Sequence, residues 1–94
     1  MKPFVHLHSH TEFSLLDGLS RLPDMVRRAK ELEQPALAIT DHGNMYAAIS
    51  FYKACVAHGI KPIIGCEVYV TEGSRLDKPE GRSRARLTHL ILLA

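Results

Sequence analysis

The sequence has few of the features that mark secreted, membrane or redox proteins. It contains no Trp and only 6% aromatic residues, and its two cysteines, Cys55 and Cys66, do not form a Cys-x-x-Cys pair. Reduced thiols are therefore expected rather than a disulfide framework or a redox centre. No run approaches the roughly 18 to 20 apolar residues that span a bilayer, and the N-terminus lacks a basic-then-apolar secretory signal. We expect a cytoplasmic protein that does not associate with membranes.

The sequence also has little excess of one charge over the other. Twelve Lys and Arg against ten Asp and Glu give a formal net charge of +2, too small to indicate a polyanionic partner. With 94 residues, 46% of them hydrophobic and 23% charged, the chain is long enough for one globular domain with a modest core. Histidine is the unusual residue, because six are present and four lie in short polar motifs.

Hydrophobic periodicity in the first 40 residues predicts a strand, a helix and a second strand. The alternating run at residues 3–8 predicts the first strand. Pro23 suits a first helical turn, and apolar residues recur after it at three- and four-residue steps, which predicts an amphipathic helix. The members of that stripe are Leu22, Met25, Val26, Ala29 and Leu32. The apolar run at residues 35–40 is typical of a buried parallel strand.

The second half of the chain continues the alternation. Asn44 is a good N-cap for a second helix that Gly59 ends. Residues 60–70 and 87–93 predict two further strands, joined by a Gly-, Pro- and Arg-rich loop. The residues expected to share a face of the second helix are Met45, Ala48, Ile49, Tyr52 and Val56.

This order of elements predicts right-handed parallel crossovers, and therefore an α/β fold with a barrel or doubly wound sheet. Four parallel strands with only two helices leave one face and both edges poorly covered. We therefore expect the chain to be the first part of a larger α/β barrel, interrupted in its fourth strand.

Polar side chains follow the predicted strands in a pattern that suits a metal. His8 and His10 lie two residues apart at the end of the first strand, His42 follows the second, and Glu67 lies late in the third. The ends of successive parallel strands meet at one rim, so these side chains should meet there. Imidazole and carboxylate are ligands of zinc, manganese or iron, and they suit hydrolysis. A lone loop histidine is usually a surface residue, but the joint pattern predicts a metal site.

Three segments resemble one known family. They are Val5-His-Leu-His-Ser-His-Thr-Glu-Phe-Ser-Leu-Leu-Asp-Gly18, Pro35-Ala-Leu-Ala-Ile-Thr-Asp-His-Gly-Asn-Met45 and Gly59-Ile-Lys-Pro-Ile-Ile-Gly-Cys-Glu67. Together they resemble the opening of bacterial DNA polymerase III alpha subunits, which is a PHP (polymerase and histidinol phosphatase) domain. The resemblance covers essentially the whole chain, and this combination is specific to the polymerase branch.

The resemblance implies a distorted seven-stranded, TIM-like β/α barrel with two or three metal ions, zinc or manganese, at its rim. Residues 1–94 would form part of that PHP domain. The positions that match the family's ligands are His8, His10, Asp17, His42, Glu67 and His89. His89 is the least secure match, because the apolar run continues after it and a ligand is expected nearer the far end of a parallel strand. A histidine in the barrel core is its alternative.

The resemblance also implies a function. The parent protein would be a DNA-directed DNA polymerase, a nucleotidyltransferase of DNA replication. Since all six positions are retained, its PHP domain would be a metal-dependent 3′ to 5′ exonuclease that proofreads. The remaining family ligands would lie beyond Ala94, so the fragment alone is expected to be inactive. The implied partners are DNA, the remaining polymerase domains, a proofreading subunit and a sliding clamp. The exposed residues 90–93 are expected to let the isolated fragment oligomerise.

Two other functions stay open. The segment could be a metal-free structural or docking module of the polymerase, or a stand-alone PHP phosphoesterase of the histidinol-phosphatase kind, against which the chain length and the run around Asp17 argue. His6 is expected in the core or hydrogen-bonded to a ligand, and Asp41 either orients His42 or caps the turn or the next helix. His58 is expected at the surface of a helix end. A solvated insertion is favoured over a phosphate-binding loop for Arg75, Lys78, Arg82, Arg84 and Arg86.

Overall fold

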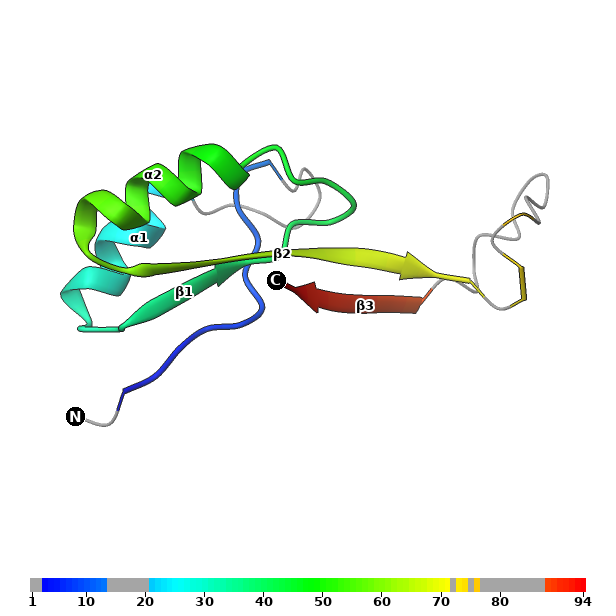
Figure 1. Ribbon diagram of the computed structural model, residues 1–94, viewed down its shortest axis with the longest axis horizontal. Helices are drawn as coiled ribbons and strands as arrows, with labels where there is room; N and C mark the ends of the chain where they lie inside the picture. Colours follow the sequence, from blue (N-terminus) through cyan, green and yellow to red (C-terminus); the bar gives the residue numbers. More distant parts are fainter. Residues whose placement is uncertain (1–2, 14–20, 72, 75, 77–87) are drawn as a thin grey trace.

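The computed structural model of the protein describes residues 3–13, 21–71, 73, 74, 76 and 88–94. Its elements are the helix α1 (Leu22–Glu31), the strand β1 (Ala36–Ile39), the helix α2 (Ala48–His58) and the strands β2 (Lys61–Val70) and β3 (Thr88–Leu93). The strands form one sheet in the order β1-β2-β3. Both helices lie on the same side of its β1 half (Figure 1). The predicted α/β class is confirmed, and Asp17 and most of the basic loop lie outside the described residues.

Helix α1 follows the predicted periodicity. Pro23 lies in the first turn, where its missing N–H leaves no hydrogen bond unmade. Leu22, Val26 and Ala29 are buried in the core that the helix shares with β1 and α2. Leu32, the last residue of the predicted stripe, follows the helix and is exposed. Neither α1 nor any other helix in the described part of the chain is long and apolar enough to cross a membrane.

The predicted face of helix α2 is wrong. The buried side chains are those of Ala47, Phe51 and Cys55, whereas Ile49 and Tyr52 are exposed. Met45 and Val56 are exposed as well. Both faces of this helix are apolar, so periodicity alone favours neither, and packing against β1 and β2 selects the face with Phe51. The helix also begins at Ala48, not next to Asn44, and Gly59 ends it in the left-handed conformation as predicted.

The predicted first strand at residues 3–8 is also wrong in detail. The segment runs beside β1, and its carbonyl groups accept hydrogen bonds from Ala38 N at His6 O and from Thr40 N at Ser9 O. The two donors are two residues apart and the two acceptors three. This mismatch breaks the regular ladder in the manner of a bulge, so the segment is extended without being a strand.

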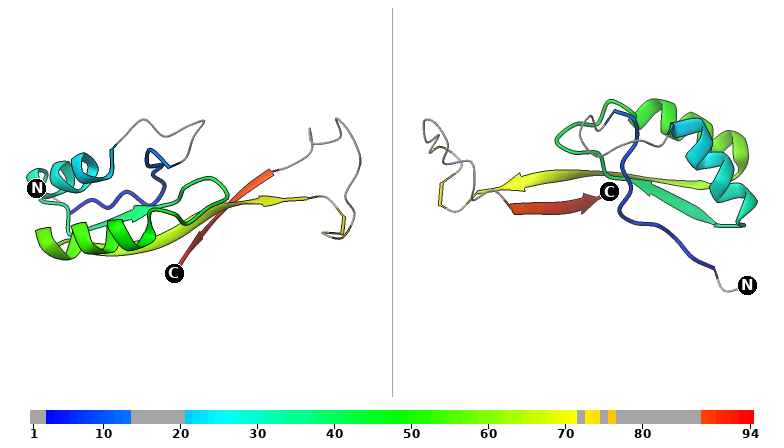
Figure 2. Two further views of the ribbon diagram at one scale, coloured as in Figure 1. Left: turned by 90° about the horizontal axis from the view of Figure 1, so that it is seen from above. Right: turned by 180° about the vertical axis from the view of Figure 1, so that it is seen from behind.

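Strand β2 changes its partner half-way along. Residues 61–64 pair in parallel with β1, and residues 65–70 pair antiparallel with β3. The expected parallel crossover into the last strand is therefore wrong, because β2 and β3 pair as an antiparallel hairpin. The hairpin extends past the two helices (Figure 2). As a result, the first residues of β3 lie beside the last residues of β2.

Gly65 marks the point where β2 leaves β1 and meets β3. A Cβ added there would lie 2.6 Å from the carbonyl oxygen of Leu92 and 3.1 Å from Cγ2 of Thr40. Because the first of these atoms belongs to the backbone, it cannot move aside without disturbing the sheet.

We expect Gly65→Ala to destabilise the protein by roughly 1 to 3 kcal/mol, since the added methyl group overpacks the sheet. Denaturant unfolding followed by circular dichroism measures the change. An unfolding midpoint equal to that of the parent would contradict the close approach of β3 at this position.

Candidate metal centre

Glu67 lies at the centre of a cluster of histidines. Its side chain is 4% exposed, and its main chain is fixed on both sides by the turn that follows β1. Glu67 N donates to Asp41 O at 3.0 Å, and Gly43 N donates to Glu67 O at 3.0 Å. This parallel bridge sets His42 opposite Glu67.

One oxygen of the Glu67 carboxylate faces the two histidines of the N-terminal segment. Oε1 lies 2.6 Å from Nε2 of His8 and 3.5 Å from Nε2 of His10. The three side chains therefore offer one nitrogen each from two imidazoles and one carboxylate oxygen, all within 4.8 Å of one another.

The other oxygen of Glu67 faces a second pair. Oε2 contacts Nε2 of His42 and lies 3.6 Å from Nδ1 of His89. His89 reaches it because β3 is antiparallel: Ile91 pairs with Glu67, so His89, two residues earlier, lies on the same face and pairs with Tyr69. The side chain of His89 is 46% exposed and faces the cluster, and its role as a ligand stays a prediction.

The four rings form a continuous row. The ring centroids are 5.2 Å apart for His8 and His10, 4.7 Å for His10 and His42, and 4.7 Å for His42 and His89. Two groups of three potential ligands thus share Glu67, each with the donor chemistry of a zinc or manganese site. A buried carboxylate charge needs compensation, which a divalent cation would supply. The residues present therefore fit a metal centre.

The candidate ligands that the structure describes lie close together, and their role as metal ligands stays a prediction. His8, His10, His42, Glu67 and His89 come together, while Asp17 lies outside the described residues. His6 does not lie in the core as one of its two predictions required. Its side chain is exposed, and its ring lies edge-on to that of Phe4, with the ring centroids 4.8 Å apart. His58 lies at the exposed end of α2, as expected.

Sequence reasoning missed two threonines that support the cluster. The Thr40 hydroxyl accepts a hydrogen bond from Ser9 N at 3.1 Å, and Thr11 contacts the Asp41 side chain. Both threonines are fully buried. Thr11 follows the candidate ligand His10, and Thr40 lies two residues before His42. The hydrogen-bond partner of each threonine is 30 or 31 residues away in the sequence, so no local pattern could have identified the pairs.

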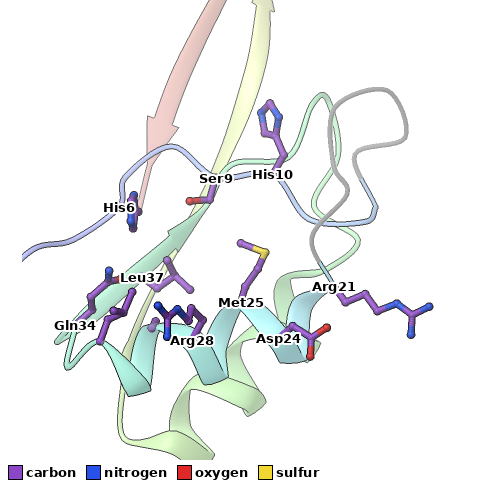
Figure 3. A pocket seen from close by; sticks show the side chains of 11 residues that line it. His6, Ser9, His10, Arg21, Asp24, Met25, Arg28, Gln34 and Leu37 are labelled. Atoms are coloured by element: carbon purple, nitrogen blue, oxygen red, sulfur yellow. The ribbon is translucent and has the colours of Figure 1, made fainter.

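A pocket of about 630 Å³ lies beside the cluster. Figure 3 shows it between the N-terminal segment, with His6, Ser9 and His10, and helix α1, with Met25 and Arg28. Of the five clustered residues only His10 lines it. The pocket is therefore adjacent to the candidate metal centre but does not enclose it.

Neither cysteine belongs to the candidate metal groups of the described chain. Burial raises the pKa of the Cys55 thiol to about 11, because the core disfavours the thiolate. Cys66 is only partly buried.

Iodoacetamide at pH 8.5 should therefore alkylate Cys66 before Cys55 in the native protein, as measured by mass spectrometry of the two peptides. Because the folded state favours the neutral Cys55 thiol, the free energy of unfolding keeps its full value below about pH 9 and falls as the pH rises through the raised pKa of about 11. In denaturant both thiols should react equally fast. Faster native alkylation of Cys55 would contradict its burial.

Comparison with known proteins agrees with this geometry. Residues 6–94 match the family model described as the PHP domain. The chain belongs to the PHP family. Its curated relatives include the DNA polymerase III subunit alpha of Treponema pallidum, 58% identical over 91 residues, and that of Thermus aquaticus, 52% identical over 94 residues. Each alignment covers 97% of this chain and 8% of the relative, so the PHP chain spans about one-twelfth of those proteins.

Solved structures also resemble this PHP chain. An amidohydrolase from Chromobacterium violaceum, described with bound sulfate and no metal, superposes with a TM-score of 0.73 at 26% identity, over 95% of this chain and 27% of that one. A protein from Bifidobacterium adolescentis, described as a candidate metal-dependent phosphoesterase, superposes with a TM-score of 0.66 at 26% identity. That superposition covers 76% of this chain and 25% of the other. The expected fold, a TIM-like PHP barrel of which this chain forms one part, is therefore confirmed.

Proposed function

We propose that the chain is the PHP domain segment of a bacterial DNA polymerase III alpha subunit and that it helps to hold the metal ions of a 3′ to 5′ exonuclease. The observation that carries this proposal is the arrangement around Glu67, whose two carboxylate oxygens each face a different pair of histidines. The identity of up to 58% to alpha subunits supports the polymerase context.

The proposed ligands divide into two groups. His8 and His10 with Glu67 would hold one cation, and His42 and His89 with Glu67 another. Asp17 is proposed to complete the set. When bound, zinc or manganese ions supply Lewis-acid activation of a phosphodiester and of the attacking water. The protein's own part is to fix the imidazoles on one side of the sheet and to keep Glu67 buried between them.

A role in docking is the second candidate. Helix α2 turns Ile49, Tyr52 and Val56 outward, with 72%, 56% and 57% of each residue exposed. An apolar face of this kind suits packing against another domain. Metal analysis distinguishes the two functions, because a scaffold need hold no ion. DNA, the other polymerase domains, a proofreading subunit and a sliding clamp remain proposed partners.

The test is metal content together with nuclease activity of the full-length protein. We expect about two or three divalent ions per chain, release of mononucleotides from a mismatched 3′ end, loss of that activity in a chelator, and its return on adding zinc or manganese. A metal-free preparation that regains no nuclease activity with any divalent ion would refute the exonuclease proposal and favour the docking role.

A further inference from the structure

Asp41 precedes His42, yet its side chain binds a different segment. The carboxylate is 2% exposed, and Thr11 contacts both of its oxygens. Thr11 N donates to Oδ1 at 2.5 Å, and the Thr11 hydroxyl donates to Oδ2 at 2.7 Å. Hydrogen bonds to an ionised acceptor are shorter and stronger than neutral ones, and two of them fix direction as well as distance. Asp41 therefore holds the residue that follows His10.

The main chain of Asp41 binds a third segment. Its carbonyl oxygen accepts a hydrogen bond from Glu67 N at 3.0 Å. Through its side chain, its carbonyl group and its peptide bond to the next residue, Asp41 is thus tied to the segments that carry His10, Glu67 and His42. These three segments are far apart in the sequence and have no regular strand pairing that includes all of them.

We propose that Thr11 and Asp41 form a positioning clamp that sets the distances among His10, His42 and Glu67, and so raises the affinity of the site for a divalent cation. This inference rests on the proposed function. Neither residue is assigned as a metal ligand, since both Asp41 oxygens are engaged by Thr11. Groups that orient ligands in this way typically change metal affinity by about 10- to 100-fold.

The N-terminal segment is attached to β1 without the clamp. Ser9 O accepts a 2.7 Å hydrogen bond from Thr40 N, and Ser9 N donates to the Thr40 hydroxyl. Loss of the Thr11 hydroxyl should therefore leave the segment beside β1 and keep the bond from Thr11 N to Asp41, while removing the second bond that fixes the direction of the Asp41 carboxylate. The Asp41 charge favours the same role, because no Lys or Arg in the described ranges forms an ion pair with it and a nearby cation would offset it.

Thr11→Val in the full-length protein tests the clamp, because it keeps the side-chain shape and removes only the hydroxyl. Titration of the metal-free protein with Co²⁺ should show affinity reduced by about 10- to 100-fold and an altered visible spectrum of the bound ion. Thr11→Ser, which restores the hydroxyl, should bind within about threefold of the parent. Asp41→Asn should weaken binding as well, and less than additively with Thr11→Val.

Val26→Ala is the matched control for stability. It removes buried volume from α1, away from the cluster, so it lowers the unfolding midpoint without changing Co²⁺ affinity. Equal affinity and spectrum in Thr11→Val and the parent would overturn the clamp and leave the metal site standing. A parent protein that binds no Co²⁺ would overturn the proposed function and the clamp together.

Discussion

Replacing Glu67 by Gln is expected to remove metal from both halves of the histidine cluster at once. One carboxylate oxygen faces His8 and His10, and the other faces His42 and His89. The amide keeps the shape but offers a single neutral oxygen, and its NH₂ group repels a cation. Because the loss of a mere orienting group costs about 10- to 100-fold, loss of this shared ligand should weaken binding by at least about 100-fold. Elemental analysis and Co²⁺ titration of the full-length protein measure the effect.

Glu31→Gln provides the matched control for this substitution. Glu31 is exposed on α1 and forms an ion pair with Arg28 at 3.0 Å. The same chemical change there should leave the metal content unaltered and change stability by less than about 1 kcal/mol. His89→Ala should weaken the group that includes His42 more than the group that includes His8. A Glu67→Gln protein that retains its full metal complement would contradict the assignment of Glu67 as the shared ligand.

The helices show where periodicity suffices and where it does not. In α1, charged residues separate the apolar ones, so a single stripe was available for burial, and Val26 and Ala29 are buried as predicted. In α2, apolar residues occupy both faces, and the choice of Phe51 over Tyr52 depends on the neighbouring sheet. The residues between Asn44 and the helix form a turn, in which the Asn44 side-chain oxygen accepts a hydrogen bond from Tyr46 N at 3.2 Å.

The candidate site was predictable in its members but not in its geometry. Short motifs and the resemblance to the PHP family identified His8, His10, His42 and Glu67, since imidazole and carboxylate groups after successive strands are an unusual combination. The direction of β3 was not predictable, because an apolar run reads the same in both directions. The antiparallel direction of β3 explains why His89 reaches Glu67. In a parallel strand, His89 would lie near the end of the sheet opposite to Glu67.

In the full-length protein, His10→Ala should abolish the proposed exonuclease activity and leave DNA synthesis largely intact. Nε2 of His10 lies 3.5 Å from Glu67, and its ring lies 4.7 Å from that of His42, so this imidazole borders both groups of proposed ligands. Its side chain is only 16% exposed, yet it lies outside the apolar core of Phe51 and its neighbours. Truncation should therefore cost metal affinity while the fold survives.

The two activities are measured on one preparation, as release of nucleotides from a mismatched primer end and as extension of a matched primer. His58→Ala is the control, because that histidine lies at the exposed end of α2, where its Nδ1 donates a local hydrogen bond to Ala54 O at 2.9 Å. It should retain both activities. If His10→Ala removed mismatched ends as fast as the parent, in the absence of other nucleases, the cluster would have no catalytic part, and its histidines would serve the structure alone. Loss of synthesis and hydrolysis together would instead indicate that the metal centre holds the polymerase in its active form, because ions bound only to the folded domain stabilise it.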